Sequence, residues 1–315
     1  MRTLGLLGTA FVSALACAGP TLAFSKSPIL FDGGLRCPAI KTGVGSCANA
    51  KYNTRIYLIP KIDGPAKALT NGATNDTHPV WSPDRARIAF YRSHTPIGGP
   101  TASHPATPDT ALWIMKADGT GAHRVAVGVT IAGNGGPTWS PDGTKIAFTG
   151  LSPNGKTTDI YGIRANGLDP IANLTNNPDK TRADYPAWSS TGQIVFSHHV
   201  SPGFPETWEM NADGSGAKSL FRGGIQYAWT PNAAKLAYVA NDNRGRLEIF
   251  VTKADGTGST QITTASSFSM PSWAPNGKQL VLVRANQITM INADGSGTKQ
   301  LTKKNPLSFV ENPAW

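Results

Sequence analysis

The chain has 315 residues, of which 34 are glycine, 24 are proline and 15% are charged, and its formal net charge is +10. Lysine and arginine are scattered, so the basic stripe with interleaved aromatics that nucleic-acid binding uses is absent. The charge suits an acidic polymer of the cell envelope as a partner, or is only a property that keeps the protein soluble.

Residues 1–23 have the composition of a secretory leader. Arg2 supplies the positive charge, residues 4–18 form the apolar stretch, and residues 21–23 end in alanine, as cleavage sites do. We expect cleavage near Ala23, with residues 14–16 as a second candidate site. The mature chain, residues 24–315, should then be periplasmic or secreted. No other segment is long and apolar enough to span a bilayer.

The three cysteines have different expected fates. Cys17 lies in the leader, where lipidation is an open alternative although Ala14 stands where lipoproteins usually have leucine. Cys37 and Cys47 lie in one loop, and an exported protein should join them in a disulfide. A zinc site is less favoured, because two thiols need further ligands and no histidine lies nearby in sequence.

From Pro28 onward, β-rich segments alternate with two kinds of turn. One turn follows a tryptophan, as in Trp-Ser-Pro-Asp-Gly at 139–143. The other contains Asp-Gly or Asn-Gly, as in Asn-Ala-Asp-Gly-Ser-Gly at 211–216. Asp-Gly and Asn-Gly provide the positive φ angles of tight hairpins. Each unit is therefore predicted to be four antiparallel strands.

One tryptophan recurs at the same place in each unit. The successive spacings are 58, 49, 41, 44 and 42 residues, and a period of about 40 with one aromatic per unit is typical of a β-propeller. We interpret the repeated side chain as a plug between neighbouring sheets. The six residues are Trp81, Trp139, Trp188, Trp229, Trp273 and Trp315.

The two ends of the chain complement each other. The last unit supplies only an inner strand that ends at Trp315, and the first unit, which begins at residues 28–31, lacks that strand. We therefore predict an all-β, six-bladed propeller with four strands per blade. The C-terminal strand should join the N-terminal blade and close the ring without a free sheet edge.

The strand order predicts which face carries function. Both turn phrases lie on one face, and the opposite face carries the variable loops at 31–53, 91–110 and 197–206. The residues three to five before each tryptophan should lie at the channel mouth on that face. Carboxylates there could meet a cation or a basic peptide, or could be solvated or bonded to the backbone. The candidate binding residues are Asp76, His78, Asp184, Tyr185, Glu311 and Asn312.

The phrase Trp-Ser-Pro-Asp-Gly-x-x-Ile-Ala-Phe at 139–148, followed by the Asn-Ala-Asp-Gly-x-Gly turn, resembles the repeat of the TolB-like β-propeller family. The resemblance covers nearly all of the mature chain and implies a binding scaffold that contacts envelope proteins through one face. TolB itself has an α/β domain before its propeller, whereas this chain reaches its first strand at Pro28. We therefore expect an exported propeller-only member rather than TolB itself.

The main hypothesis is a monomeric, non-enzymatic scaffold that binds a protein or peptide of the envelope, with no cofactor and no metal. The sequence lacks the Gly-x-Ser-x-Gly, His-Glu-x-x-His and phosphate-loop motifs. The alternative is a metal-dependent lyase or hydrolase that acts on a polysaccharide at the channel, with His198 or His199 joining His78. A third possibility is a purely structural domain.

Overall fold

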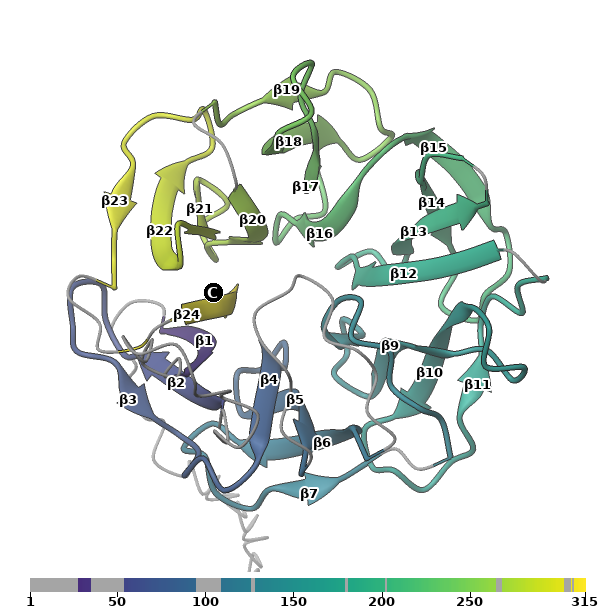
Figure 1. The fold of residues 1–315 in the computed structure, drawn as a ribbon, viewed down its shortest axis with the longest axis horizontal. Helices are drawn as coiled ribbons and strands as arrows, with labels where there is room; N and C mark the ends of the chain where they lie inside the picture. Colours follow the sequence, from purple (N-terminus) through teal and green to yellow (C-terminus); the bar gives the residue numbers. More distant parts are fainter. Residues whose placement is uncertain are drawn as a thin grey trace, which may run out of the picture.

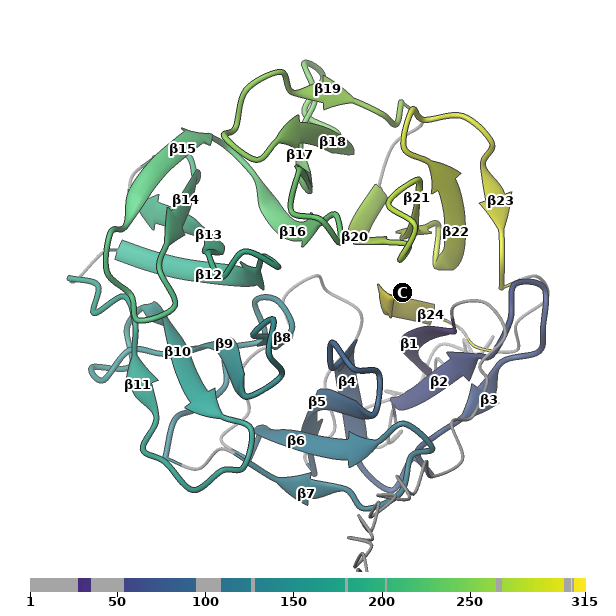
Figure 2. The same ribbon diagram turned by 180° about the vertical axis from the view of Figure 1, so that it is seen from behind.

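The computed structural model describes residues 28–34, 54–94, 109–125, 128–178, 181–201, 203–264, 268–302, 307 and 309–315. These residues form six four-stranded sheets, arranged as blades around a central axis (Figures 1 and 2). The predicted all-β propeller is therefore confirmed. Within these ranges no helix is long and apolar enough to cross a membrane. The predicted leader and both Cys37 and Cys47 lie outside the described residues.

The blades are numbered here from the one that holds the N-terminal strand, and strands are given from the axis outward. Blade 1 consists of β24 (Phe309–Ala314), β1 (Ile29–Gly34), β2 (Arg55–Ile59) and β3 (Lys67–Ala68). Blade 2 consists of β4 (Asn75–Trp81), β5 (Arg87–Ser93), β6 (Ala111–Lys116) and β7 (His123–Arg124). Blade 3 consists of β8 (Thr138–Trp139), β9 (Lys145–Leu151), β10 (Thr158–Arg164) and β11 (Ala172–Asn173).

The second half of the ring has the same plan. Blade 4 consists of β12 (Thr181–Trp188), β13 (Ile194–Val200), β14 (Glu206–Met210) and β15 (Lys218–Arg222). Blade 5 consists of β16 (Ile225–Trp229), β17 (Lys235–Asn241), β18 (Leu247–Lys253) and β19 (Thr260–Gln261). Blade 6 consists of β20 (Phe268–Trp273), β21 (Gln279–Arg284), β22 (Gln287–Asn292) and β23 (Lys299–Gln300).

The hydrophobic core lies between the blades. Because each sheet is covered on both faces, its second strand is apolar along most of its length rather than alternating. In β9, for example, the residues from Ile146 to Gly150 are all buried. Phe148 of blade 3 packs in one cluster with Leu112 of blade 2, and similar clusters fill the other joints of the ring.

The ring closes as predicted from the incomplete first and last repeat units. Strand β24 pairs antiparallel with β1, so the C-terminal strand is the inner strand of the N-terminal blade (Figure 1). Val310 and Trp315 are buried in the cluster between blades 6 and 1. An ion pair between Lys299 and Asp63, with 2.5 Å between Nζ and Oδ2, crosses the same joint at the surface.

The repeated tryptophans stand at the end of the inner strands, or directly after it for Trp315, and lie at the joints between blades. The indole nitrogen of Trp139 donates to the carbonyl oxygen of Val80 in the preceding blade at 3.4 Å. Trp229 and Trp273 make the equivalent bonds to the carbonyl oxygens of Ala187 and Ala228, at 3.2 and 3.1 Å. In these three blades the tryptophan therefore fills the joint and ties one inner strand to the next.

Candidate functional site

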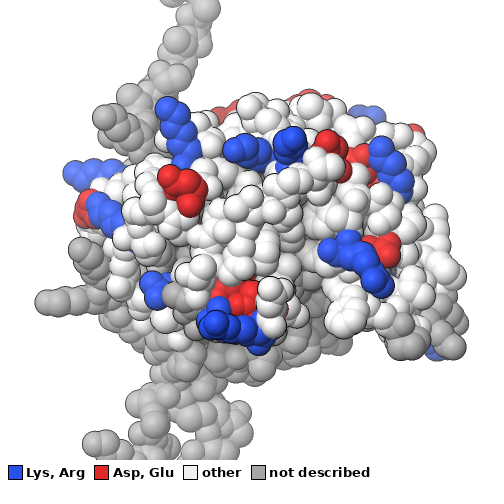
Figure 3. All heavy atoms as spheres, turned by 90° about the horizontal axis from the view of Figure 1, so that it is seen from above, with Lys and Arg blue, Asp and Glu red and all other residues white. Residues whose placement is uncertain are grey.

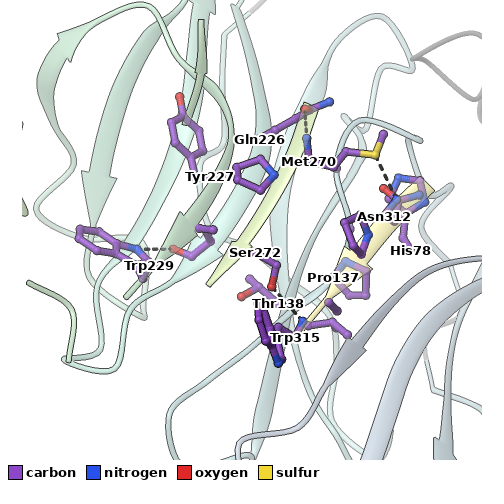
Figure 4. A pocket seen from close by; sticks show the side chains of 18 of the residues that line it. His78, Pro137, Thr138, Gln226, Tyr227, Trp229, Met270, Ser272, Asn312 and Trp315 are labelled. Carbon is purple, nitrogen blue, oxygen red and sulfur yellow. Dashed lines mark hydrogen bonds between the residues drawn. The ribbon is translucent and has the colours of Figure 1, made fainter. Parts of the chain in front are cut away.

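The inner strands of all six blades surround a cavity of about 500 Å³ on the propeller axis. Its lining is mostly proline, aromatic and small apolar residues, with a few hydroxyl and amide groups (Figure 4). Pockets of this size, largely apolar with a few convergent polar groups, are the usual form of a binding site. We therefore take this central channel as the candidate functional site.

The channel is encircled by residues whose backbone is left-handed. In five blades the residue three positions before the repeated tryptophan has φ between 48° and 58°. In blade 3 the positive φ, 91°, falls on Gly135, four positions before Trp139. Non-glycine residues rarely adopt this conformation, and they do so mostly at functional or tightly constrained positions. This left-handed ring consists of His78, Gly135, Tyr185, Gln226, Met270 and Asn312, all of which line the cavity.

The left-handed residues mark β-bulges. The pairing of the inner strand with the next strand shifts register at this point in blades 1, 2, 4, 5 and 6. A bulge leaves one residue outside the ladder and redirects its side chain. In four of these blades the following residue is proline. Proline has no backbone N–H, so the interruption of the ladder leaves no donor without a partner at that position.

Hydrogen bonds from neighbouring blades hold several ring residues in place. The backbone N–H of Met270 donates to Oε1 of Gln226 at 2.9 Å, and the N–H of Asn312 donates to Sδ of Met270 at 3.1 Å (Figure 4). The N–H of Tyr185 donates to the carbonyl oxygen of Asn134 at 3.2 Å. These bonds link the bulges of blades 5, 6 and 1 in series and tie the bulge of blade 4 to blade 3.

Asp32 joins the ring across the seam. Its Oδ2 accepts from the side-chain amide of Asn312 at 2.8 Å and from the backbone N–H of His78 at 2.7 Å. The residue is 1% exposed, and its Oδ1 has no hydrogen-bond partner among the described residues. Burial raises the pKa of Asp32 to about 6, although the two hydrogen bonds oppose this shift.

The structure separates the predicted mouth residues into two groups. His78, Tyr185 and Asn312 line the cavity, and burial raises the pKa of Tyr185 to about 12. The cavity lining includes none of the three predicted carboxylates, Asp76, Asp184 and Glu311.

Two of these carboxylates are held by arginines. Asp76 is fully buried and accepts two hydrogen bonds from Arg92, at 2.6 and 2.9 Å. Asp184 lies 3.3 Å from Arg182 and accepts from the amide of Asn134 at 3.1 Å. Glu311 is half-buried on β24, opposite Asp32 in the strand register.

The histidines considered for a metal centre do not meet at the channel. Only His78 lines the cavity. The ring of His198 packs against that of Trp208 with centroids 4.3 Å apart, and burial lowers the pKa of this histidine. His199 bonds to the carbonyl oxygen of Gly203. In the part of the chain that the structure describes, no group of three or more His, Cys, Asp or Glu side chains is placed to hold a metal ion.

The family model of the TolB beta propeller domain matches residues 107–315. The chain belongs to the TolB β-propeller family. The solved TolB of Acinetobacter baumannii has 21% sequence identity and a TM-score of 0.67, over 93% of this chain and 67% of that one. A putative TolB of Agrobacterium tumefaciens has 15% identity and a TM-score of 0.60, over 88% and 89% of the two chains.

The same fold also occurs in enzymes. An oligogalacturonate lyase of Vibrio parahaemolyticus has 14% identity and a TM-score of 0.52, over 79% of this chain and 71% of the lyase. At these identities the likeness is one of fold, and function has to be argued from the channel residues of this TolB-family propeller.

From the sequence we identified three of the six residues of the left-handed ring, His78, Tyr185 and Asn312, and missed the other three. Gln226 and Met270 stand at the same offset before a tryptophan as His78, so the repeat alignment could have found them. Unlike the three predicted strands, neither of their strands has a carboxylate three to five residues before the tryptophan. Asp32 gave one usable signal, an acidic residue directly after an apolar strand segment.

Proposed function

We propose that this protein is a non-enzymatic scaffold of the cell envelope that binds a protein partner and receives an extended segment of that partner in the central channel. One observation carries the proposal: the left-handed ring lines a cavity of about 500 Å³ and is fixed by bonds between blades. Such a preorganised site loses little entropy when a ligand binds.

The lining suits a peptide. Tyr185, Tyr227 and Trp229 offer aromatic surface, and the side chains of Gln226 and Asn312 offer amide groups among apolar neighbours. Aromatic-lined grooves with few polar groups are a recurring means of binding extended, proline-containing segments. We propose His78, Tyr185 and Asn312 as contact residues. Asp76 and Asp184 would act indirectly, by holding Arg92 and Arg182 beside the mouth.

Crosslinking in intact envelopes followed by affinity purification tests this function. The informative variant is Tyr185→Gly, which removes the phenol ring but suits the left-handed backbone, where φ is 58°. We expect it to stay folded and to lose most of the crosslinked partner. Leu168→Ala is the control, because Leu168 is 84% exposed and lies outside the cavity lining. Recovery of the same partners by both variants would exclude the channel as the binding site.

The proposed envelope location follows from the predicted leader. We expect the mature protein to begin at Phe24 and to carry a disulfide between Cys37 and Cys47. Intact mass measured before and after reduction, on protein purified from envelope fractions, checks both features. A full-length product that keeps residues 1–23 and has Cys37 and Cys47 as free thiols would contradict them.

A further inference from the structure

Arg85 is the one charged residue among the described residues that line the channel. It lies in the turn after β4, close in sequence to Pro83, which also lines the cavity. The other charged side chains of the described chain lie elsewhere, with both signs interspersed on the side of the molecule drawn in Figure 3. A single cation in a mostly apolar cavity gives this end of the channel a positive potential.

The backbone at Arg85 is unfavourable for arginine. Three of the other tryptophan turns have glycine at the equivalent position, Gly143, Gly192 and Gly277, with φ of 66°, 96° and 64°. Arg85 has φ of 57° at that position. A left-handed conformation costs a side-chain-bearing residue roughly 1–2 kcal/mol relative to its preferred one. The chain therefore carries a cation where glycine would fit the turn better.

The guanidinium of Arg85 has no acidic partner among the described residues. It lies 5.7 Å from the ring centroid of Trp81 and makes a long hydrogen bond of 3.5 Å to the carbonyl oxygen of Pro28. Burial lowers the pKa of Arg85, and no nearby carboxylate opposes this shift. By contrast, Arg92 and Arg246 are each bonded to a carboxylate. A half-buried guanidinium with unused donors is well suited to bind a planar anion in a bidentate manner.

We propose that Arg85 binds a carboxylate of the peptide segment that occupies the channel, either an acidic side chain or a free C-terminus. This inference rests on the proposed function and adds a specificity to it. A peptide is favoured over a polyanion because the lining has one cation rather than a series. A polyanion would place several charges in the remaining apolar lining without a partner.

Affinity selection from two libraries of short random peptides, one with free C-terminal carboxylates and one amidated, tests the proposal. The key variant is Arg85→Gly, because glycine suits the turn and the variant should remain folded. Arg85→Lys keeps the charge. Lys278→Gln removes the same charge from an exposed residue in the corresponding turn of blade 6 and serves as the control.

We expect the wild type and Lys278→Gln to enrich peptides that carry a carboxylate at a fixed position. Arg85→Gly should bind these peptides about tenfold more weakly or worse, since hydrogen bonds to charged groups are worth at least that much. Arg85→Lys should keep part of the preference. Unchanged carboxylate selection by Arg85→Gly, or selection without any carboxylate preference by the wild type, would overturn the inference but leave the proposed function standing.

Acetate supplies a second readout that does not require a peptide. In the NMR spectrum of the wild type, the Nε–Hε resonance that is missing in Arg85→Gly should shift saturably with acetate. If acetate shifts this resonance but neither library yields any binder, the proposed peptide-binding function fails, and the peptide assignment fails with it. Stronger displacement of acetate by short oligogalacturonates than by selected peptides would also overturn the peptide assignment.

Discussion

Single residues in the channel, and Asp32 beside it, adopt states that are unfavourable on their own. His78, Tyr185, Gln226 and Met270 have left-handed backbones without being glycine, and Asp32 is a carboxyl group buried away from solvent. Each such feature costs on the order of 1 kcal/mol or more and persists only because its surroundings enforce it. Here the surroundings are the hydrogen bonds between blades, so the stability of the ring maintains the site.

Asp32 gives the clearest prediction at this scale. Its pKa is about 6 in the folded protein and 3.8 in the reference state, so the unfolded chain releases this proton at lower pH. The contribution of Asp32 to stability is therefore fully present below about pH 4, and it is lost as the pH rises toward 6. In Asp32→Asn this loss, about 3 kcal/mol, should disappear.

Urea unfolding of wild type and Asp32→Asn at a series of pH values measures the effect. Asp142→Asn is a control, because the stabilising effect of Asp142 should depend on pH in the opposite direction. Hydrogen bonds from Ser140 and Thr144 lower the pKa of Asp142 to about 2, so its stabilising contribution is lost only as the pH falls below about 4. A difference between wild type and Asp32→Asn that is the same at pH 4 and pH 7 would contradict the prediction.

At the scale of elements, the turns do more than reverse the chain. The glycine of the Asp-Gly turn approaches the outer strand of the preceding blade. A methyl group on Gly214 would overlap the carbonyl oxygen of Leu174, and one on Gly119 would lie 2.7 Å from the carbonyl oxygen of Leu69. The sequence predicts glycine here for its positive φ, and the packed ring adds a steric reason.

Two glycine substitutions separate these causes. Gly214→Ala should lower the free energy of unfolding by about 2–4 kcal/mol, because backbone strain and the contact with blade 3 both oppose the methyl group. Gly155→Ala should cost only about 1–2 kcal/mol, because Gly155 has φ of 69° but nothing within 4 Å of the added methyl. Equal losses for the two variants in chemical unfolding would show that blade contact is unimportant.

The whole molecule is a closed ring whose seam depends on β24. The ion pair between Lys299 and Asp63 is largely exposed and contributes at most about 1 kcal/mol. The pairing of β24 with β1 and the burial of Val310 and Trp315 must therefore provide most of the closure. Without β24, blade 1 would expose the inner edge of β1 to pairing with other chains.

Removal of residues 309–315 should abolish the single cooperative unfolding transition and promote aggregation. A synthetic peptide of residues 307–315, added in excess, should restore a transition at higher temperature by occupying the vacant edge. Differential scanning calorimetry with and without this peptide measures both effects. The same peptide with Trp315→Ala is the control and should restore less. A truncated chain that unfolds like the full one would refute this account of the seam.

The sequence alone determined the architecture, because the tryptophan period, the Asx-Gly turns and the two incomplete ends are local patterns repeated along the chain. These patterns predicted six blades and the joining of β24 to β1. They also placed His78, Tyr185 and Asn312 at the channel, because one offset from the tryptophan defines the same position in each blade.

Tertiary structure decided which of these residues are available to a ligand. The sequence does not show that Asp76 is bonded to Arg92, or that Asp32 of β1 reaches His78 and Asn312 in two other strands. Arg85 looks like an ordinary turn residue until the closed ring shows that it is the lone cation among the described residues of the channel. Burial and charge pairing depend on residues far apart in the chain, and only the assembled ring brings them together.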